Sequence, residues 1–270
     1  MVEIIKKYKI GTRRFGYINW IGAYALYKKE VLRFLIVWAQ TIFSPIISAL
    51  LFLVVLNLAI GDQRGEVLGV SFINFLAPGL IAMQIIQQSF SHSSSSFMIG
   101  KIQKNIVDIL YAPLSPAEVT LAVTFAALTR SVMIAFISII VFYFLIDLQI
   151  ENFLNLLIFT FLSGFILGAI GVIAGLWAEK FDHMATVTNF VIVPLSFLSG
   201  TFYSIERLPD FLKVISKANP FFYMIDGFRF SFINQSDSSI SIGIIYLTVL
   251  SLVVWLIAYS LFKAGYKIKS

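Results

Sequence analysis

Residues 153–177 read FLNLLIFTFLSGFILGAIGVIAGLW, a stretch that contains no charged side chain. A helix rises about 1.5 Å per residue, so roughly 20 apolar residues cross the ~30 Å apolar core of a bilayer. The stretch also lacks the alternation of polar and apolar residues that is typical of a membrane-spanning strand. The sequence therefore predicts a membrane-spanning helix here.

Five further stretches of the same kind occur on either side of it, with charged residues between them. Apolar residues make up 59% of the 270-residue chain and charged residues only 13%, against about 45–50% and 25% in soluble domains. We therefore expect an all-α integral membrane protein with six spans. In chain order, the predicted spans are 34–60, 72–98 (within a charge-free tract at 67–100), 119–146, 153–177, 184–204 and 239–262.

The cationic residues predict the orientation of these spans. Lys and Arg are enriched in short cytoplasmic loops, and six spans place both termini on the same side. With cytoplasmic termini, 14 of the 20 cations lie inside, five lie outside, and Arg130 lies within a span. The inside residues are Lys6, Lys7, Lys9, Arg13, Arg14, Lys28, Lys29, Arg33, Lys101, Lys104, Lys180, Lys263, Lys267 and Lys269. The outside residues are Arg64, Arg207, Lys213, Lys217 and Arg229. We read residues 1–33 as a retained cytoplasmic tail with an interfacial helix, and 34–270 as the transmembrane domain.

The interfacial helix is predicted from an amphipathic pattern just before the first span. Trp20, Tyr24 and Tyr27 recur at helical spacing, and three cations follow between Lys28 and Arg33. This pattern is typical of a helix in the headgroup layer, with its aromatic residues toward lipid and its cations outward. A cytoplasmic extension of the first spanning helix is the alternative.

The loop between the second and third spans, 101–118, is too long for a simple turn. Ile106, Ile109 and Leu110 share one face of a short helix that Pro113 would end. Such a helix suits a docking element for a partner, or it rests on the membrane surface. The residues themselves leave both readings open.

Two short outer helices are predicted before the sixth span. Pro209-Asp210 opens the first, and Asn219-Pro220 opens the second, with Asn as the N-cap and Pro at the first helical position. The second helix sets several aromatic residues against Asp226 and Arg229, so we expect it to be amphipathic. The pair would lie at the outer interface or form a re-entrant-like hairpin inside protein.

Polar residues within the spans mark two further candidates. A stripe on the second span must face protein or water, as the lining of a transport path, as a seam between subunits, or as ordinary helix packing. Its members are Gln84, Gln87, Gln88, Ser91 and Ser95. Arg130 in the third span is a functional candidate or a snorkelling, packing residue. We expect no acid in the spans to pair with it, and we read His92 as a satisfied hydrogen-bonding group.

A second set of small residues predicts packing rather than function. Gly164, Gly168, Gly171 and Gly175 fall on one face of the fourth span, and small residues allow membrane helices to approach closely.

No enzyme motif occurs in the sequence. It has no Cys, no H-E-x-x-H, no G-x-S-x-G and no phosphate-binding G-x-x-x-x-G-K-[ST] loop. Catalytic, cofactor-binding and metal-binding residues are therefore not expected in this chain. Any dependence on ATP would come from a separate subunit.

Several motifs together resemble the membrane subunits of the ABC-2 type transporter family, over residues 20–265. They lie at Phe75–Leu80 (FLAPGL), Lys101–Ile106 (KIQKNI), Leu110–Pro116 (LYAPLSP), Leu198–Tyr203 (LSGTFY) and Tyr223–Arg229 (YMIDGFR), the last accompanied by Leu208-Pro209 and Asn219-Pro220. The likeness is strongest to the branch that includes nodulation-factor-type export permeases.

The resemblance implies a homodimer in the bacterial inner membrane that works with two copies of a separate ATP-binding cassette ATPase. ATP and Mg would be bound by that ATPase, and no nucleic-acid partner is expected. The interfacial helix and the 101–118 loop would contact the ATPase, and the outer helices would cap the pathway. The implied coupling residues are Lys101, Lys104, Asn105, Ile106, Ile109 and Leu110.

The resemblance further implies export of a glycolipid, a polysaccharide or a drug-like molecule. Two other functions are weighed against it. A secondary transporter would need a coupling-ion site near the midplane, and no internal repeat or buried acid is apparent. A lipid-modifying enzyme would have only Asp226 and Arg229 as a candidate pair.

Overall fold

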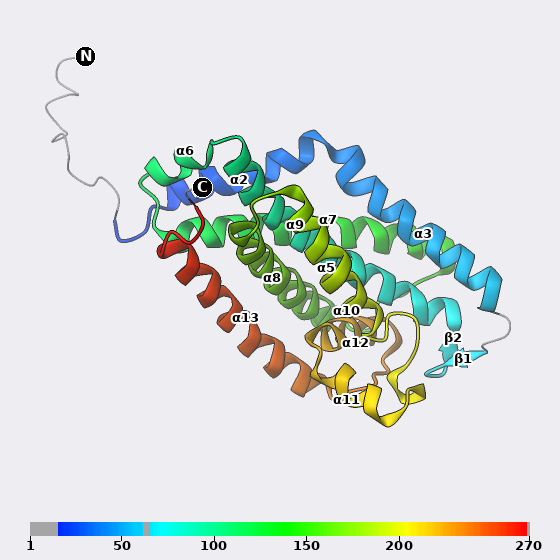
Figure 1. Ribbon diagram of the computed structural model, residues 1–270. Helices are drawn as coiled ribbons and strands as arrows, with labels where there is room; N and C mark the ends of the chain where they lie inside the picture. The colour runs from blue at the N-terminus through cyan, green and yellow to red at the C-terminus, as the bar shows by residue number, and fades with distance from the viewer. Residues whose placement is uncertain (1–15, 62–64, 269–270) are drawn as a thin grey trace, which may run out of the picture.

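The computed structural model describes residues 16–61 and 65–268 (Figure 1). The predictions made for the tail before Gly16, for Arg64 and for Lys269 lie outside these residues. The elements form an elongated helical bundle, with α2, α6 and the C-terminal segment at one end and α11, α12 and a small hairpin at the other (Figure 1). In chain order they are α2 (Trp20–Ile36), η1 (Ala39–Phe43), α3 (Ser44–Leu56), η2 (Asn57–Gly61), β1 (Glu66–Val67), β2 (Val70–Ser71), α5 (Phe72–Ile102), α6 (Ile106–Tyr111), α7 (Pro116–Ile146), α8 (Phe153–Trp177), α9 (Phe181–Val187), η3 (Thr188–Ile192), α10 (Val193–Phe197), η4 (Ile205–Arg207), α11 (Asp210–Ala218), α12 (Pro220–Ile233) and α13 (Ile240–Lys263).

Four helices of the described residues are long and apolar enough to cross a membrane. They are Ala39–Gly61, which joins η1, α3 and η2, together with α7, α8 and α13. These four correspond to the first, third, fourth and sixth predicted spans, and α8 has the predicted bounds. The all-α membrane class is confirmed.

The two remaining predicted spans are helical but differ from these four. The helix α5 has 31 residues, so its length suffices, but its Gln and Ser residues dilute its apolar character. The fifth span is shorter than predicted, because the helical run from α9 through α10 ends at Phe197 and turns follow. At about 1.5 Å per residue, this run is roughly 25 Å long.

The turns after Phe197 have a local cause. The hydroxyls of Ser199 and Thr201 donate to the carbonyls of Leu195 and Ser196, and Gly200 adopts a φ of +76°, which favours glycine. The prediction that the fifth helix continues to Ser204 is therefore wrong.

The helix α2 is separate from the first spanning helix. Val37, with φ −108° and ψ 37°, interrupts the helix between them, and the Thr41 hydroxyl donates to the carbonyl of Phe34 across the break at 2.9 Å. A continuous cytoplasmic extension of the first span is thus contradicted. A position of α2 in the headgroup layer stays a prediction.

The helix α7 begins at Pro116, three residues before the predicted start of the third span. Ser115 and Glu118 form a reciprocal capping box, in which the Glu118 backbone N–H donates to Ser115 Oγ at 3.3 Å and the Ser115 N–H donates to Glu118 Oε2 at 2.6 Å. This motif satisfies N–H groups that the first turn leaves without partners. A carboxylate that the charge pattern placed in the loop therefore belongs to the helix.

The glycine face of α8 packs closely against α5 and α7, as predicted. A β-carbon at Gly171 would lie 2.6 Å from the carbonyl oxygen of Phe90, and one at Gly175 would lie 2.8 Å from that of Ser94. A β-carbon at Gly164 would lie 2.6 Å from Leu128 Cδ1 of α7, and one at Gly168 would lie 3.2 Å from the carbonyl oxygen of Thr124. The central three helices therefore approach each other with backbone against backbone.

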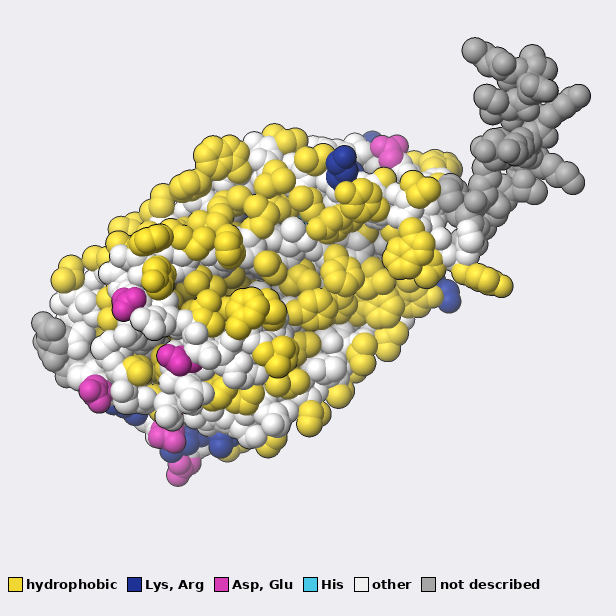
Figure 2. Space-filling model, turned by 180° about the vertical axis from the view of Figure 1, so that it is seen from behind, with side chains coloured by type: hydrophobic (Ala, Val, Ile, Leu, Met, Phe, Trp, Pro, Cys, Tyr) yellow, Lys and Arg dark blue, Asp and Glu magenta, His cyan; other side chains and the backbone are white. Residues whose placement is uncertain are grey.

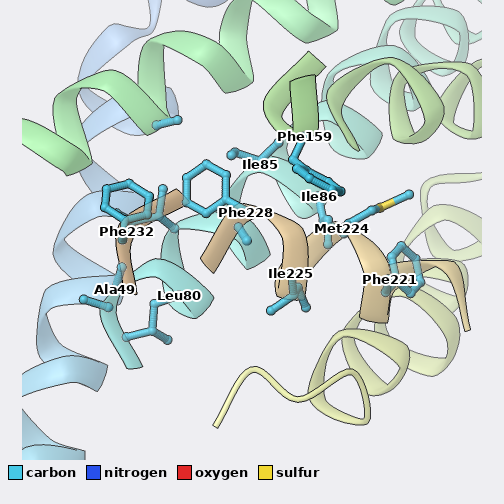
Figure 3. Packing of buried hydrophobic residues seen from close by; sticks show 14 of the residues in the cluster. Ala49, Leu80, Ile85, Ile86, Phe159, Phe221, Met224, Ile225, Phe228 and Phe232 are labelled. Carbon is cyan, nitrogen blue, oxygen red and sulfur yellow. The ribbon is translucent and has the colours of Figure 1, made fainter. Parts of the chain in front are cut away.

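The largest apolar cluster lies around α12 (Figure 3). Phe228 of α12 lies beside Ile85 of α5, and Met224 lies near Phe159 of α8 (Figure 3). Asp226 and Arg229 of the same helix are also buried, each only 1% exposed. The prediction that α12 is amphipathic is wrong, because the bundle surrounds this helix and its two charged side chains bind groups inside the protein.

The outer surface carries a broad apolar belt. Figure 2 shows apolar side chains over most of the visible face, with Lys, Arg, Asp and Glu gathered near its two ends. Along α13, Ile242, Ile245, Val249, Leu252 and Leu256 are each more than half exposed. Such a belt is what the lipid-facing surface of a spanning bundle requires.

Candidate functional site

The polar stripe of α5 lies at the edge of an otherwise buried helix. Gln84 is buried, Gln87, Gln88 and Ser95 are half-buried, and Ser91 is exposed. Lipid cannot satisfy these amide and hydroxyl groups. The stripe therefore marks a face of the single chain that must lie against water or protein in the membrane.

Two arginines from neighbouring helices converge on this stripe. Arg130 of α7 donates to Gln88 Oε1 at 2.5 Å. Arg33 of α2 donates to the His92 carbonyl at 3.0 Å and to Ser95 Oγ at 3.3 Å. The expectation that Arg33 points outward with the other cations of its helix is wrong, because its guanidinium binds α5.

A buried acid lies beside them. Glu30 of α2 is 1% exposed and its Oε2 accepts from Arg33 Nε at 2.9 Å. The same oxygen lies 3.8 Å from Nε2 of His92, whose ring is fully buried. The reading that no buried acid is apparent is therefore wrong, although Glu30 lies on α2 and not on a predicted span.

His92 also differs from its predicted role. Neither of its ring nitrogens has a hydrogen-bond partner among the described residues, and the ring packs edge-on against Phe34 at 5.6 Å between centroids. It is thus a buried polar group without a partner rather than a satisfied one.

The short helix α6 lies at the end of the bundle that also carries α2 and the C-terminal segment (Figure 1). It ends at Tyr111, as the predicted stop at Pro113 requires. Ile106 is buried against α5, Ile109 is half-buried, and Leu110 is 43% exposed. Lys104 and Asn105, just before the helix, are exposed.

Lys101 is the coupling candidate that faces inward. Its ammonium donates to the carbonyls of Leu176 and Ala178, at the C-terminal end of α8. A cation there complements the unpaired carbonyls and the negative end of the helix dipole. Among the predicted coupling residues, Lys101 therefore binds α8 while Leu110 is accessible.

One joint connects α2, α6 and α7. The Asn19 side chain caps α2 by accepting from the Gly22 N–H at 2.9 Å, and donates to the Pro113 carbonyl at 3.0 Å. The Asn19 backbone N–H donates to Glu118 Oε1 at 2.7 Å. Asn19 thereby ties the loop after α6 to the starts of α2 and α7.

An exposed ion pair lies at the same end of the molecule. Lys267 Nζ donates to Glu179 Oε1 at 2.7 Å, and this hydrogen bond lowers the pKa of Glu179 and raises the pKa of Lys267. It holds the C-terminal segment against the loop between α8 and α9.

At the opposite end, Arg229 connects three segments through backbone carbonyls. It donates to Phe75 of α5 at 3.1 Å, and to Gly200 and Thr201 at 2.7 and 3.2 Å. Its guanidinium also lies 3.8 Å from the centre of the Phe75 ring. Such contacts compensate the burial of a charged group.

Asp226 and Asn219 complete the outer end. Asp226 accepts from the backbone N–H groups of Asp237 and Ser238 at 2.9 and 3.0 Å, and so positions the start of α13. Asn219 caps α12 and donates to Ser199 Oγ at 2.7 Å. Asp226 and Arg229 thus have separate partners, and the structure does not bring them together as a pair.

The remaining outer candidates lie at the helix starts, as predicted. Pro209 occupies the N-cap position of α11 and is exposed, and Pro220 is the first residue of α12. The apolar face of α11 is also exposed, with Phe211 and Val214 at 65% and 69%.

Comparison with known proteins identifies the arrangement. The family model described as ABC-2 type transporter matches residues 22–233. The chain belongs to this family. It is a membrane component of a transport system and resides in the inner membrane.

Similar proteins are transport and nodulation proteins. The inner membrane transport permease YadH of Escherichia coli K12 is 29% identical over 254 residues, which cover 94% of this chain and 99% of YadH. Nodulation protein J of Rhizobium leguminosarum bv. viciae is 24% identical over 263 residues, covering 94% and 97%. Nodulation protein J of Neorhizobium galegae is 22% identical over 215 residues, covering 79% and 81%.

Some residues of this ABC-2 protein that build the site were not singled out from the sequence. Asn19, Glu30 and Glu118 each have partners more than 50 residues away or on another helix. One signal was available for Glu30, which shares a helical face with the apolar residues Leu26 and Phe34. A charged residue at a core position of an amphipathic helix indicates an internal partner.

Proposed function

We propose that this ABC-2 protein is the permease subunit of an ATP-driven exporter. It would act as a homodimer with two copies of a separate ATPase, and would move a glycolipid, a polysaccharide or a drug-like amphiphile outward. Its domains would be the predicted ones, 1–33 as tail and interfacial helix and 34–270 as transmembrane domain. Six crossings, with α5 and the α9–α10 run as the second and fifth, would place both termini in the cytoplasm.

The observation that carries this proposal is the position of α6. It joins two long helices, α5 and α7, at the end of the bundle where α2 and the C-terminal segment also lie (Figure 1). It exposes the apolar Leu110 and Tyr111, at 43% and 86%. An exposed apolar surface on a short helix suits a partner that pushes on the bundle, and Asn19 ties the loop after this helix to α2 and α7.

The missing phosphate-binding loop supports a division of labour. Since the chain has no G-x-x-x-x-G-K-[ST] sequence, ATP and Mg would be bound by the partner. This chain would supply the path and the coupling surface.

The first experiment is purification of the chain from its native membrane, followed by an ATPase assay. Co-purification of a nucleotide-binding subunit that hydrolyses ATP would support the proposal. A chain that purifies without ATPase from an intact transport-competent membrane would overturn it.

A second experiment tests α6 itself. Leu110→Glu places a charge on the accessible face, so we expect transport and transport-coupled ATPase to fall at least tenfold while the amount of inserted permease is unchanged. Phe181→Glu is the matched control, because Phe181 is 56% exposed at the start of α9 and lies off α6. Normal transport by Leu110→Glu, or an equal loss in the control, would contradict the docking role.

Secondary active transport is the alternative, and one observation favours it. Glu30 and His92 place a buried acid and a buried imidazole 3.8 Å apart, as a proton-coupled site would require. Transport that persists after ATP depletion and collapses with the proton gradient would replace the exporter proposal with this one.

A further inference from the structure

Arg130 is half-buried and carries a positive charge that the described protein does not neutralise. Among residues 16–61 and 65–268, no carboxylate lies within 4.0 Å of its guanidinium. Its guanidinium donates to the neutral amide of Gln88, and its Nε–H has no hydrogen-bond partner among the described residues. A cation within a membrane span that has no anionic partner is energetically costly, so this group is suited to bind an anion.

A second cation lies along the same stripe. Gln88, His92 and Ser95 are spaced i, i+4 and i+7 on α5, which spans about 10 Å of the helix axis. Arg130 binds at the first of these positions and Arg33 at the other two. Glu30 faces Arg33 and Lys29, so two cations share a single carboxylate and Arg130 has none among the described residues.

The stripe between the two arginines remains open on the single chain. Ser91 is exposed, Gln87 and Gln88 are half-buried, and the Arg33 side chain is 29% exposed. Hydroxyl and amide donors next to a guanidinium are the groups that bind phosphate or carboxylate oxygens, and the planar fork of Arg binds such groups with two bonds.

The depth of the site narrows the class of ligand. Arg130 is close to the middle of α7, which runs from Pro116 to Ile146, so the anion has to reach the middle of the bundle. On the face of α7 that carries Arg130, the apolar residues Met133 and Ile137, three and seven positions further along, are half-buried. An anionic group attached to an apolar chain fits these neighbours better than a free ion does, because the chain gains free energy when it buries its apolar surface against them.

We propose that Arg130, with Arg33 and the Gln88–Ser95 edge of α5, binds the phosphate or carboxylate group of an amphiphilic cargo during transport. The proposal rests on the proposed export function and narrows its cargo to acidic amphiphiles. Gln88 orients Arg130, and Glu30 holds Arg33 beside the stripe.

Binding is measured first, on the purified full chain in phosphatidylcholine nanodiscs. The probes are a short-chain phosphatidic acid, the diacylglycerol with the same chains, and inorganic phosphate. We expect phosphatidic acid to bind at least tenfold more tightly than either of the others. If the diacylglycerol binds equally well, the site does not recognise an anionic group. If inorganic phosphate binds equally well, the ligand does not need an apolar chain. Either result would overturn the proposal.

Variants then locate the site. Arg130→Gln should weaken phosphatidic acid binding by about ten- to a hundredfold, the value of one or two charge-assisted hydrogen bonds. Arg130→Lys keeps the charge and should retain much of the binding, which separates recognition from misfolding. Lys28→Gln removes an exposed cation from α2 and should change nothing. Unchanged binding in Arg130→Gln, or an equal loss in Lys28→Gln, would overturn the proposal.

The ATPase of the intact complex distinguishes a cargo from a bound bilayer lipid. Phosphatidic acid should stimulate the native complex and not the Arg130→Gln complex. If phosphatidic acid binds in an Arg130-dependent way but does not stimulate an active ATPase, the site binds a lipid headgroup of the bilayer. That result would overturn the proposal that the ligand is a transported cargo. A native complex that lacks ATPase altogether would sink the export function, while the binding measurements would still decide the anion site.

Discussion

Gly227 of α12 meets the ring of Phe159 on α8 with no space for a methyl group. A β-carbon built there would lie 2.1 Å from two ring atoms, far below a van der Waals contact. Phe159 is fully buried in the main cluster, so its ring cannot simply rotate outward. The contact lets α12 lie directly against α8, and this in turn places Arg229 within reach of Phe75.

Gly227→Ala should destabilise the fold. Overpacking of a closely packed core costs about 1–3 kcal/mol, and the midpoint of thermal unfolding in detergent should fall accordingly. Gly243→Ala on α13 is the control, because its nearest contact would be Tyr223 Cδ1 at an ordinary 3.4 Å, and Ala favours the helix. A Gly227→Ala protein as stable as the control would contradict the packing described here.

Among the elements, α2 is the one whose contacts differ most from those of an independent surface helix. Its N-terminus is held by Asn19 and Glu118, its middle by the Tyr27 hydroxyl at 2.8 Å from Thr129 Oγ1, and its end by Arg33 on α5. Trp20 and Tyr24 remain exposed, at 73% and 64%. The helix thus has one face fixed to the bundle and one aromatic face free for the interface.

Asn19→Ala should loosen this end without unfolding the bundle. It removes the cap of α2 and the bond to Pro113, and loss of an N-cap costs about 1 kcal/mol. Hydrogen exchange should accelerate at residues 20–24 and around 112–115. Asn105→Ala is the control, since Asn105 precedes α6 without capping it and should leave exchange unchanged. Equal protection in both variants would rule out the joint.

Helices were more predictable than their surroundings, and the reasons are local. The bounds of α8 follow from its charge-free stretch, and the start of α12 follows from Asn219-Pro220, since both signals act within a few residues. The burial of α12 was not predictable. Arg229 finds its acceptor at Phe75, 154 residues away, and no local pattern indicates that partner. Arg33 reaches Ser95, 62 residues away, in the same way, so the local pattern predicted only that its side chain points outward with the other cations of its helix. Whether the predicted coupling and path residues act as such stays a prediction.

At the scale of the whole molecule, charged side chains gather near the two ends and the apolar belt lies between them (Figure 2). The proposed six-crossing topology depends mainly on the α9–α10 run, which is shorter than a typical span. If this run does not cross, the segment that carries α11 and α12 would face the cytoplasm.

Single cysteines test that topology, because the natural chain has none. Lys217→Cys should react with a membrane-impermeant thiol reagent from outside intact cells. Lys28→Cys, Lys104→Cys and Lys180→Cys should react only after the membrane is opened. Lys217 protected from the outside would refute the fifth crossing.

Attachment of the C-terminal segment should depend on pH through Glu179 and Lys267. Because the pKa of Glu179 is lowered from 4.5, its contribution to the attachment is complete above pH 4.5 and is lost as the pH falls through the lowered pKa. Because the pKa of Lys267 is raised from 10.5, its contribution to the attachment is complete below pH 10.5 and is lost as the pH rises through the raised pKa. A spin label on Tyr266→Cys should therefore be least mobile between these limits. Adding Glu179→Gln should increase its mobility at neutral pH and remove the acid transition; an unaltered profile would speak against the pair.

The joint at Asn19 also has a consequence for the order of assembly. Asn19 is anchored by a carboxylate 99 positions further along the chain, and Arg33 by groups 59 and 62 positions further. A ribosome releases the chain from its N-terminus, so α2 emerges long before the groups that hold it exist. Contacts between distant positions form late because the intervening chain has to be closed first. The helix α2 must therefore wait at the membrane surface until α7 has begun, and its exposed aromatic face is suited to hold it there.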